Sequence, residues 1–203
     1  MLDLVLSDTL TASDAEPGDY FGYSVAIFGD TVVAGAPYDS NTGSAYIFRM
    51  TDGGATSVEV AKLKAADAVA GDFFGRSVAI DANTVVVGAW YQSSRRGAAY
   101  VFRTTDGGAT YGQVAKLTAS DAAVDDNFGF SVAIAGSTLV VGAPDHNGER
   151  GAVYVFTMTD GGTTYLQEVK LTASDAATND HFGCSVAIDG NTVVVGTTNK
   201  ESV

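Results

Sequence analysis

The chain has 203 residues, of which 46% are apolar and only 17% charged, so it can bury a core and is not a disordered segment. Its formal net charge of −13 argues against a nucleic-acid partner, because a polyanion would be repelled and no stripe of Lys and Arg is present to contact phosphates. No apolar run approaches the roughly 18 residues needed to span a bilayer, so membrane insertion is not expected, and residues 1–8 lack the basic start of a signal peptide.

A Phe-Gly dipeptide recurs at Phe21, Phe74, Phe128 and Phe182, at intervals of 53 or 54 residues. A period of this length is typical of a repeat architecture, in which one supersecondary unit is copied in series. Residues shared by all copies are therefore expected to be scaffold. Residues that differ between copies are the candidates for function.

The second copy illustrates the elements expected in each unit. Short apolar, β-branched segments are separated by turn residues such as those at 81–84 and 105–108. We expect four consecutive antiparallel strands, at Phe74–Ile80, Val85–Ala89, Gly97–Phe102 and Tyr111–Leu117. No helical periodicity lies between the copies.

A repeated four-stranded meander of about 50 residues is the unit of a β-propeller, so the sequence predicts an all-β fold of about four four-stranded antiparallel blades. Residues 1–203 form a single domain in this interpretation. The repeat units are 14–66, 67–120, 121–174 and 175–203, and residues 2–13 are the last strand of a preceding or closing blade. The last copy has room for two strands, so the ring is either nearly closed, an arc of a larger ring, or open at edges that associate with another chain.

Phe-Gly followed by Gly-Ala-Pro at a fixed spacing is seen in Phe21-Gly22 with Gly35-Ala36-Pro37, and in Phe128-Gly129 with Gly142-Ala143-Pro144. The chain thereby resembles the FG-GAP repeats, which implies the propeller of integrin α-subunit heads and related cell-surface proteins. It is still more similar to the tandem repeats of bacterial and algal surface proteins that contain Lys-Leu-Thr-Ala-Ser-Asp-Ala, found here at 116–122 and 170–176.

Integrin-type repeats carry an Asp-rich calcium loop between their first two strands. The corresponding loops here, such as Asp81-Ala-Asn-Thr84, cannot supply the six to eight oxygens that calcium takes. Calcium is therefore not expected at that loop, and no cofactor is predicted.

A pair of aspartates flanks each connection between units, five residues apart. One interpretation is a shared cation, for which calcium is the candidate; the other is turn capping through backbone N–H groups. The candidate metal ligands are Asp14, Asp19, Asp67, Asp72, Asp121, Asp126, Asp175 and Asp180.

Two other patterns resemble catalytic or metal sites. Gly-x-Ser-Val-Ala, at Ser24, Ser77, Ser131 and Ser185, is similar to a nucleophile elbow, but four copies and only two histidines favour a structural hydroxyl. His181 and Cys184 lie close in sequence, yet two ligands do not make a zinc site. We therefore predict that the chain has no catalytic residues and is not an enzyme.

The loops between the second and third strands differ most between copies and should lie on one rim of the propeller. Aromatic and arginine side chains there are types enriched at binding hot spots. The alternative is ordinary loop variation with a solvated Arg pair. The candidate partner-binding residues are Tyr38, Trp90, Tyr91, Arg95, Arg96 and His146.

These observations predict a non-enzymatic binding or structural module that presents rim loops to a protein or glycan, as in adhesion, at an extracellular or cell-surface location. One alternative is an accessory subunit of a larger complex, for instance in an organelle lumen. Another is a hydrolase or lyase on a propeller scaffold, which would need a polar cluster that breaks the repeat pattern.

Overall fold

Each copy of the repeat folds into strands that pair in chain order. The computed structural model describes residues 9–199. Blade 1 consists of β1 (Ser24–Phe28), β2 (Thr31–Ala36), β3 (Ser44–Thr51) and β4 (Thr56–Leu63). Blade 2 consists of β5 (Ser77–Asp81), β6 (Thr84–Ala89), β7 (Ala98–Arg103) and β8 (Gly112–Leu117).

The second half of the described chain repeats this pattern in one complete blade and one half-blade. Blade 3 consists of β9 (Ser131–Ala135), β10 (Thr138–Ala143), β11 (Ala152–Met158) and β12 (Tyr165–Leu171). The fourth copy forms the two-stranded half-blade of β13 (Ser185–Asp189) and β14 (Thr192–Gly196). The strands within each sheet pair antiparallel, so the predicted all-β fold of repeated antiparallel blades is confirmed, and residues 9–199 contain three complete blades.

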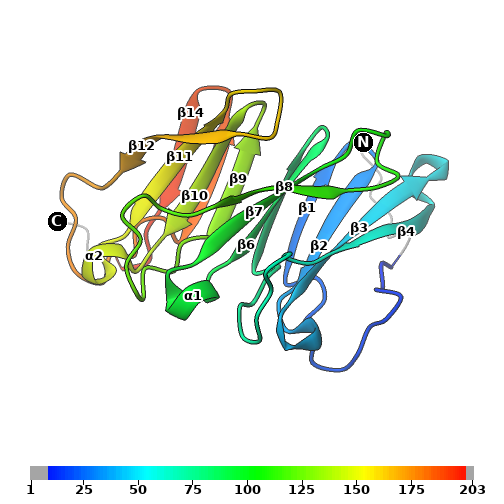
Figure 1. The fold of residues 1–203 in the computed structure, drawn as a ribbon, viewed down its shortest axis with the longest axis horizontal. Coiled ribbons are helices and arrows are strands. Elements are labelled where there is room, and N and C mark those ends of the chain that lie inside the picture. Colours follow the sequence, from blue (N-terminus) through cyan, green and yellow to red (C-terminus); the bar gives the residue numbers. More distant parts are fainter. Residues whose placement is uncertain (1–8, 200–203) are drawn as a thin grey trace, which may run out of the picture.

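The blades stack face to face through their apolar side chains. Strands β1, β5, β9 and β13 contact one another in succession and form the inner side of the stack. The core between blades 1 and 2 includes Val33 and Ile47 from one sheet and Val85 and Tyr100 from the next. Figure 1 shows the sheets following one another without the last meeting the first, so the described part of the chain is an arc rather than a closed ring.

The Phe-Gly dipeptide lies in a turn, which corrects the predicted start of the first strand. In blade 2 that strand begins at Ser77 rather than at Phe74. Gly75 has a φ of +94°, a left-handed conformation that suits glycine, and Phe74 forms an isolated parallel bridge with Gly43 of blade 1. The phenyl ring of Phe74 is fully buried, so the dipeptide joins adjacent blades instead of extending a strand.

Short helical turns occupy loops on the blades. Those between second and third strands are η1 (Asp39–Asn41), α1 (Gln92–Arg95) and α2 (His146–Glu149), and η2 (Asp52–Gly54) joins β3 to β4. Within residues 9–199 no helix has the length and apolar character to cross a membrane. The strand predicted over residues 2–13 lies mostly outside the described residues, and residues 9–13 contain no strand.

Candidate binding surface

The recurrent serines bind neighbouring blades. The hydroxyl of Ser24 donates to the carbonyl oxygen of Gly75 over 2.9 Å. Ser77 makes the same bond to Gly129 (2.9 Å), and Ser131 makes it to Gly183 (2.7 Å). Each hydroxyl thus ties one blade to the Phe-Gly turn of the next, which confirms the structural interpretation of these serines.

The first aspartate of the first three pairs is part of a three-residue unit. In blade 2 the buried Tyr100 hydroxyl donates to Asp67 Oδ1 (2.8 Å), and Lys116 Nζ donates to Asp67 Oδ2 (2.6 Å). Burial acts to raise the pKa of the Asp67 carboxyl, but these hydrogen bonds outweigh it and hold that pKa below its ordinary value of 3.8. The same unit occurs as Asp14, Tyr46 and Lys62, and as Asp121, Tyr154 and Lys170.

The second aspartate of each pair caps its own turn. Asp72 Oδ2 accepts a hydrogen bond from the backbone N–H of Val69 over 2.8 Å, and burial raises the pKa of its carboxyl. Asp19, Asp126 and Asp180 accept the corresponding bond in the other copies. The two carboxylates of a pair therefore have different partners. Among residues 9–199 no cluster of three or more His, Cys, Asp or Glu side chains is arranged to hold a metal ion, and cation sharing by these pairs stays a prediction.

A continuous row of aromatic rings crosses the loops of blades 1 to 3. Ring centroids are 4.7 Å apart for Tyr20 and Tyr38, and 5.0 Å apart for Tyr38 and Phe73. Phe73 stacks on Trp90 at 5.9 Å and meets Tyr91 edge-on at 5.5 Å. We call these rings, together with Phe130, which contacts Trp90, the aromatic row. The tyrosines Tyr20, Tyr38 and Tyr91 are exposed, so the row presents ring surface to solvent.

The scaffold fixes the position of this row through an unusual backbone conformation. The residue before each Phe-Gly has a left-handed φ of 51° to 59° in all four copies: Tyr20, Phe73, Asn127 and His181. Left-handed backbone is costly for residues other than glycine, so its presence in all four copies indicates that the turn is part of the scaffold. The side chain at this position differs between copies, which indicates that it belongs to the variable surface.

Cationic side chains lie against the aromatic row. The guanidinium of Arg76 stands 4.1 Å from the ring centroid of Phe130 and 4.8 Å from that of Tyr23. Arg95 lies 5.8 Å from the rings of both Trp90 and Tyr91. Such cation–π contacts hold the rings in defined orientations.

At the blade 3 end, the same positions carry polar side chains. Asn127 and His181 both hydrogen-bond Asp145, which matches Tyr38 and Tyr91 in the repeat; the His181 Nδ1 to Asp145 Oδ1 distance is 2.8 Å. Arg95 Nε donates to Asn127 Oδ1 over 3.2 Å, and its terminal nitrogens pair with Asp125 (3.1 Å) and Asp145 (3.4 Å).

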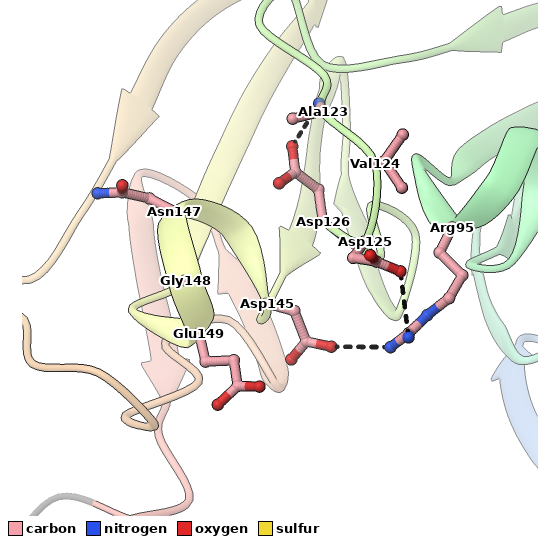
Figure 2. Close-up of a pocket in the computed structure, with 9 residues that line it drawn as sticks. All are labelled: Arg95, Ala123, Val124, Asp125, Asp126, Asp145, Asn147, Gly148 and Glu149. Atoms are coloured by element: carbon pink, nitrogen blue, oxygen red, sulfur yellow. Dashed lines mark hydrogen bonds and ion pairs between the residues drawn. The ribbon is translucent and has the colours of Figure 1, made fainter.

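A cavity of about 410 Å³ opens beside this polar end (Figure 2). Four carboxylates and one guanidinium line it, with α2 forming one side. The acidic lining residues are Asp125, Asp126, Asp145 and Glu149. Since Arg95 already pairs with two of the four, the cavity has an excess of negative charge.

The structure brings together most of the residues predicted to bind a partner. Tyr38, Trp90, Tyr91 and Arg95 lie in or against the aromatic row. Arg96 is exposed beside them and donates to the carbonyl oxygen of Ser93. His146 is separate: its side chain is only 11% exposed, and its Nδ1 lies 3.0 Å from Asp126 Oδ2.

Sequence reasoning missed the residues of this surface that border the Phe-Gly dipeptides, namely Tyr20, Tyr23, Phe73, Arg76 and Phe130. The sequence contains a pattern that could have identified them, because the residues just before and just after the recurrent Phe-Gly differ in every copy. The left-handed turn that exposes them was not readable from residue types.

Comparisons with known proteins agree with the fold. The chain matches the FG-GAP repeat family over residues 6–48, 57–102, 111–156 and 165–202. It is 30% identical to human integrin alpha-11 in an alignment of 192 positions that covers 83% of this chain, and 29% identical to bovine integrin alpha-2 in an alignment of 191 positions with the same coverage. It spans 16% of the length of each of these relatives.

Among solved structures, Sqt1 from Saccharomyces cerevisiae is similar with a TM-score of 0.52 at 11% identity, covering 80% of this chain and 38% of that one. This similarity concerns the fold, which is propeller-like in both proteins. Four repeat matches over most of the sequence, with stacked antiparallel blades, show that the chain belongs to the FG-GAP repeat family and folds as an arc of its β-propeller.

Proposed function

We propose that this chain is a non-enzymatic, adhesion-type binding module that holds a protein partner on its aromatic row. The observation that carries the proposal is the unbroken ring-to-ring contact from Tyr20 to Phe130 across three blades, with all three tyrosines of the row exposed. Similarity to integrin α-subunits supports a binding role at the level of the family, and supports an extracellular or cell-surface location for the protein.

The chemistry of the row suits protein recognition. Tyrosine and tryptophan bury a large area for few rotatable bonds, and they are enriched among residues that dominate binding energy. The rings here pack on one another and on Arg76 and Arg95, so little conformational entropy would be lost when a partner binds.

The charge of the surface favours a partner with basic residues. The aromatic row ends at the acidic cavity beside α2, and the whole chain has a net charge of −13. A Lys or Arg of the partner would be drawn to this cavity while its apolar side chains cover the rings.

The test replaces both tyrosines that follow the second strands, in the double variant Tyr38→Ser/Tyr91→Ser. The third copy has Asp145 at the matching position, so the loop accepts a polar side chain. A photo-crosslinking amino acid at Tyr20 would first capture and identify a partner from extracellular and cell-surface protein fractions. The affinity of that partner would then be measured with each variant.

We expect the double variant to bind at least about tenfold more weakly, because hot-spot aromatic side chains each contribute about 2 kcal/mol or more. The control is Leu166→Ser, which removes an exposed apolar side chain from the outer strand β12. Equal affinity in both variants would reject the aromatic row as the binding site. If the chain binds a glycan array and the double variant does not, the partner of the aromatic row is a glycan and not a protein.

A further inference from the structure

A second cavity lies in blade 2, at the place in the repeat that matches the acidic cavity beside α2. It measures about 290 Å³ and opens between the connection at 69–72 and the turn at 91–94, which contains most of α1. The acidic cavity is bounded by the corresponding segments, 123–126 and 145–149. The repeat therefore forms a hollow at this place in two blades. We call the hollow beside α1 the blade 2 cavity.

The lining of the blade 2 cavity is nearly neutral. Of the described residues that line it, only Asp72 carries a charge, whereas four carboxylates and a guanidinium line the acidic cavity. Val69 and the exposed ring of Tyr91 provide apolar surface, and Gln92 and Ser93 provide polar groups. This composition suits a ligand with both polar groups and an apolar face.

Two buried polar side chains at the cavity have unused hydrogen-bonding capacity. Gln92 is only 8% exposed, and its amide forms no hydrogen bond with the rest of residues 9–199. Asp72 is 5% exposed; its Oδ2 accepts from the backbone N–H of Val69, and its Oδ1 has no donor within those same residues. Neither group is completely enclosed by protein, so both reach the open space of the cavity. Because buried polar groups normally have partners, these atoms indicate a ligand.

The matching positions in the other complete blades have their partners inside the chain. Asp39 stands where blade 2 has Gln92, and its Oδ2 lies 2.7 Å from Lys62 Nζ. His146 stands there in blade 3, and its Nδ1 lies 3.0 Å from Oδ2 of Asp126, the counterpart of Asp72. In blade 3 a ring of the chain itself thus reaches the buried carboxylate. In blade 2 that contact is left for a group from outside.

The hydrogen-bonding types of the two free groups select the ligand. A carboxylate oxygen only accepts, whereas a glutamine amide both donates and accepts. An ammonium or guanidinium group would satisfy Asp72 but could not accept from Gln92 Nε2, because it has no acceptor. A hydroxyl group can donate to the carboxylate and accept from the amide, so a ligand with adjacent hydroxyls satisfies both side chains.

Size and charge narrow the ligand further. At ~30 Å³ for each water-sized group, the cavity holds roughly ten such groups, about the size of one sugar ring with its hydroxyls. The Tyr91 ring offers a flat apolar surface for the C–H groups of such a ring. An acidic sugar would be repelled by Asp72 and by the net charge of −13.

We propose that the blade 2 cavity binds one neutral sugar residue. Adjacent hydroxyls of the sugar hydrogen-bond Asp72 Oδ1 and the Gln92 amide, and one face of the ring packs on Tyr91. This site is separate from the acidic cavity and does not depend on a protein partner on the aromatic row.

The test is an NMR titration of the ¹⁵N-labelled full chain with glucose, galactose, mannose and N-acetylglucosamine, and with glucuronate as an acidic comparison. At least one neutral sugar should shift the side-chain NH₂ resonances of Gln92 in a saturable way. Glucuronate should bind more weakly, because Asp72 repels its carboxylate. The same spectra report whether each variant is folded.

The variant Gln92→His installs the residue that blade 3 has at this position. Its imidazole should contact Asp72 as His146 contacts Asp126, and so occupy the site. We expect the affinity for the sugar to fall at least about tenfold, because both hydrogen bonds to the ligand are lost. The matched control is Gln167→His on β12, outside the cavity, which should bind the sugar like the wild type.

Three results would overturn the proposal: no neutral sugar shifts the Gln92 resonances, Gln92→His binds as well as the wild type, or glucuronate binds as tightly as the neutral sugars. Tyr91 borders both the cavity and the aromatic row, so single variants separate the two sites. Tyr38→Ser alters only the row and should weaken the protein partner while keeping the sugar. Gln92→His should do the reverse, and a sugar lost in Tyr38→Ser but kept in Gln92→His would lie on the row and contradict the cavity site.

Discussion

At the scale of single residues, the unit of aspartate, tyrosine and lysine is the main polar contact repeated in every full blade. Tyr100→Phe removes one hydroxyl from a fully buried site and leaves Asp67 with only the lysine as a side-chain partner. We expect the free energy of unfolding to fall by about 1 kcal/mol, the usual net value of such a hydrogen bond. Urea denaturation would measure it, with the exposed Tyr23→Phe as a control that should show no change.

The same unit predicts how stability depends on pH. The folded pKa values of Asp14, Asp67 and Asp121 lie below the ordinary value of 3.8. Between the folded and unfolded pKa values the unfolded chain binds more protons, so the stabilisation is complete above about pH 4 and is lost as pH falls through the folded values. Asp72 opposes this trend, since burial raises its pKa.

We therefore expect the unfolding free energy to decline below about pH 4, with a shallower slope in Asp67→Asn, whose side chain does not titrate. The measurement is a series of urea denaturation curves from pH 6 to pH 2.5. An unchanged slope in Asp67→Asn would show that other carboxylates control acid unfolding.

At the scale of elements, the glycine near the end of the second strand in each complete blade lies tightly against the backbone of the next blade. A Cβ at Gly88 would overlap the carbonyl oxygen of Gly129 in the next blade as well as the hydroxyl of Ser77. At Gly196, in the half-blade, a Cβ would meet only the side chain of Ser185 at short range. Substitution by alanine at Gly88 therefore tests the backbone contact between blades together with the contact within the hairpin. The same substitution at Gly196 tests the contact within the hairpin alone.

We expect Gly88→Ala to destabilise the chain by at least about 2 kcal/mol, because overpacking against a fixed backbone forces the blades apart. Gly196→Ala should cost clearly less. Thermal or urea unfolding of the two variants would check this order, and Gly142→Ala should behave like Gly88→Ala. Equal losses at Gly88 and Gly196 would mean that the hydroxyl contact, and not the blade interface, sets the cost.

The elements themselves could largely be predicted from the sequence, since turn residues and β-branched runs act locally. The observed β6 and β8 begin within one residue of their predicted starts. The contacts of the candidate surface could not be predicted in this way. Asp67 and Lys116 are 49 residues apart, and the burial of His146 depends on Asp126 and Lys170 from separate segments.

At the scale of the whole molecule, the described arc resembles a short solenoid, in which each blade packs mainly against its neighbours. Local stability should then follow the number of neighbours. Amides of β5 and β9, which have a blade on both sides, should exchange with solvent most slowly. Amides of β1 and β14, at the two open faces, should exchange faster, as hydrogen–deuterium exchange resolved by peptide would show.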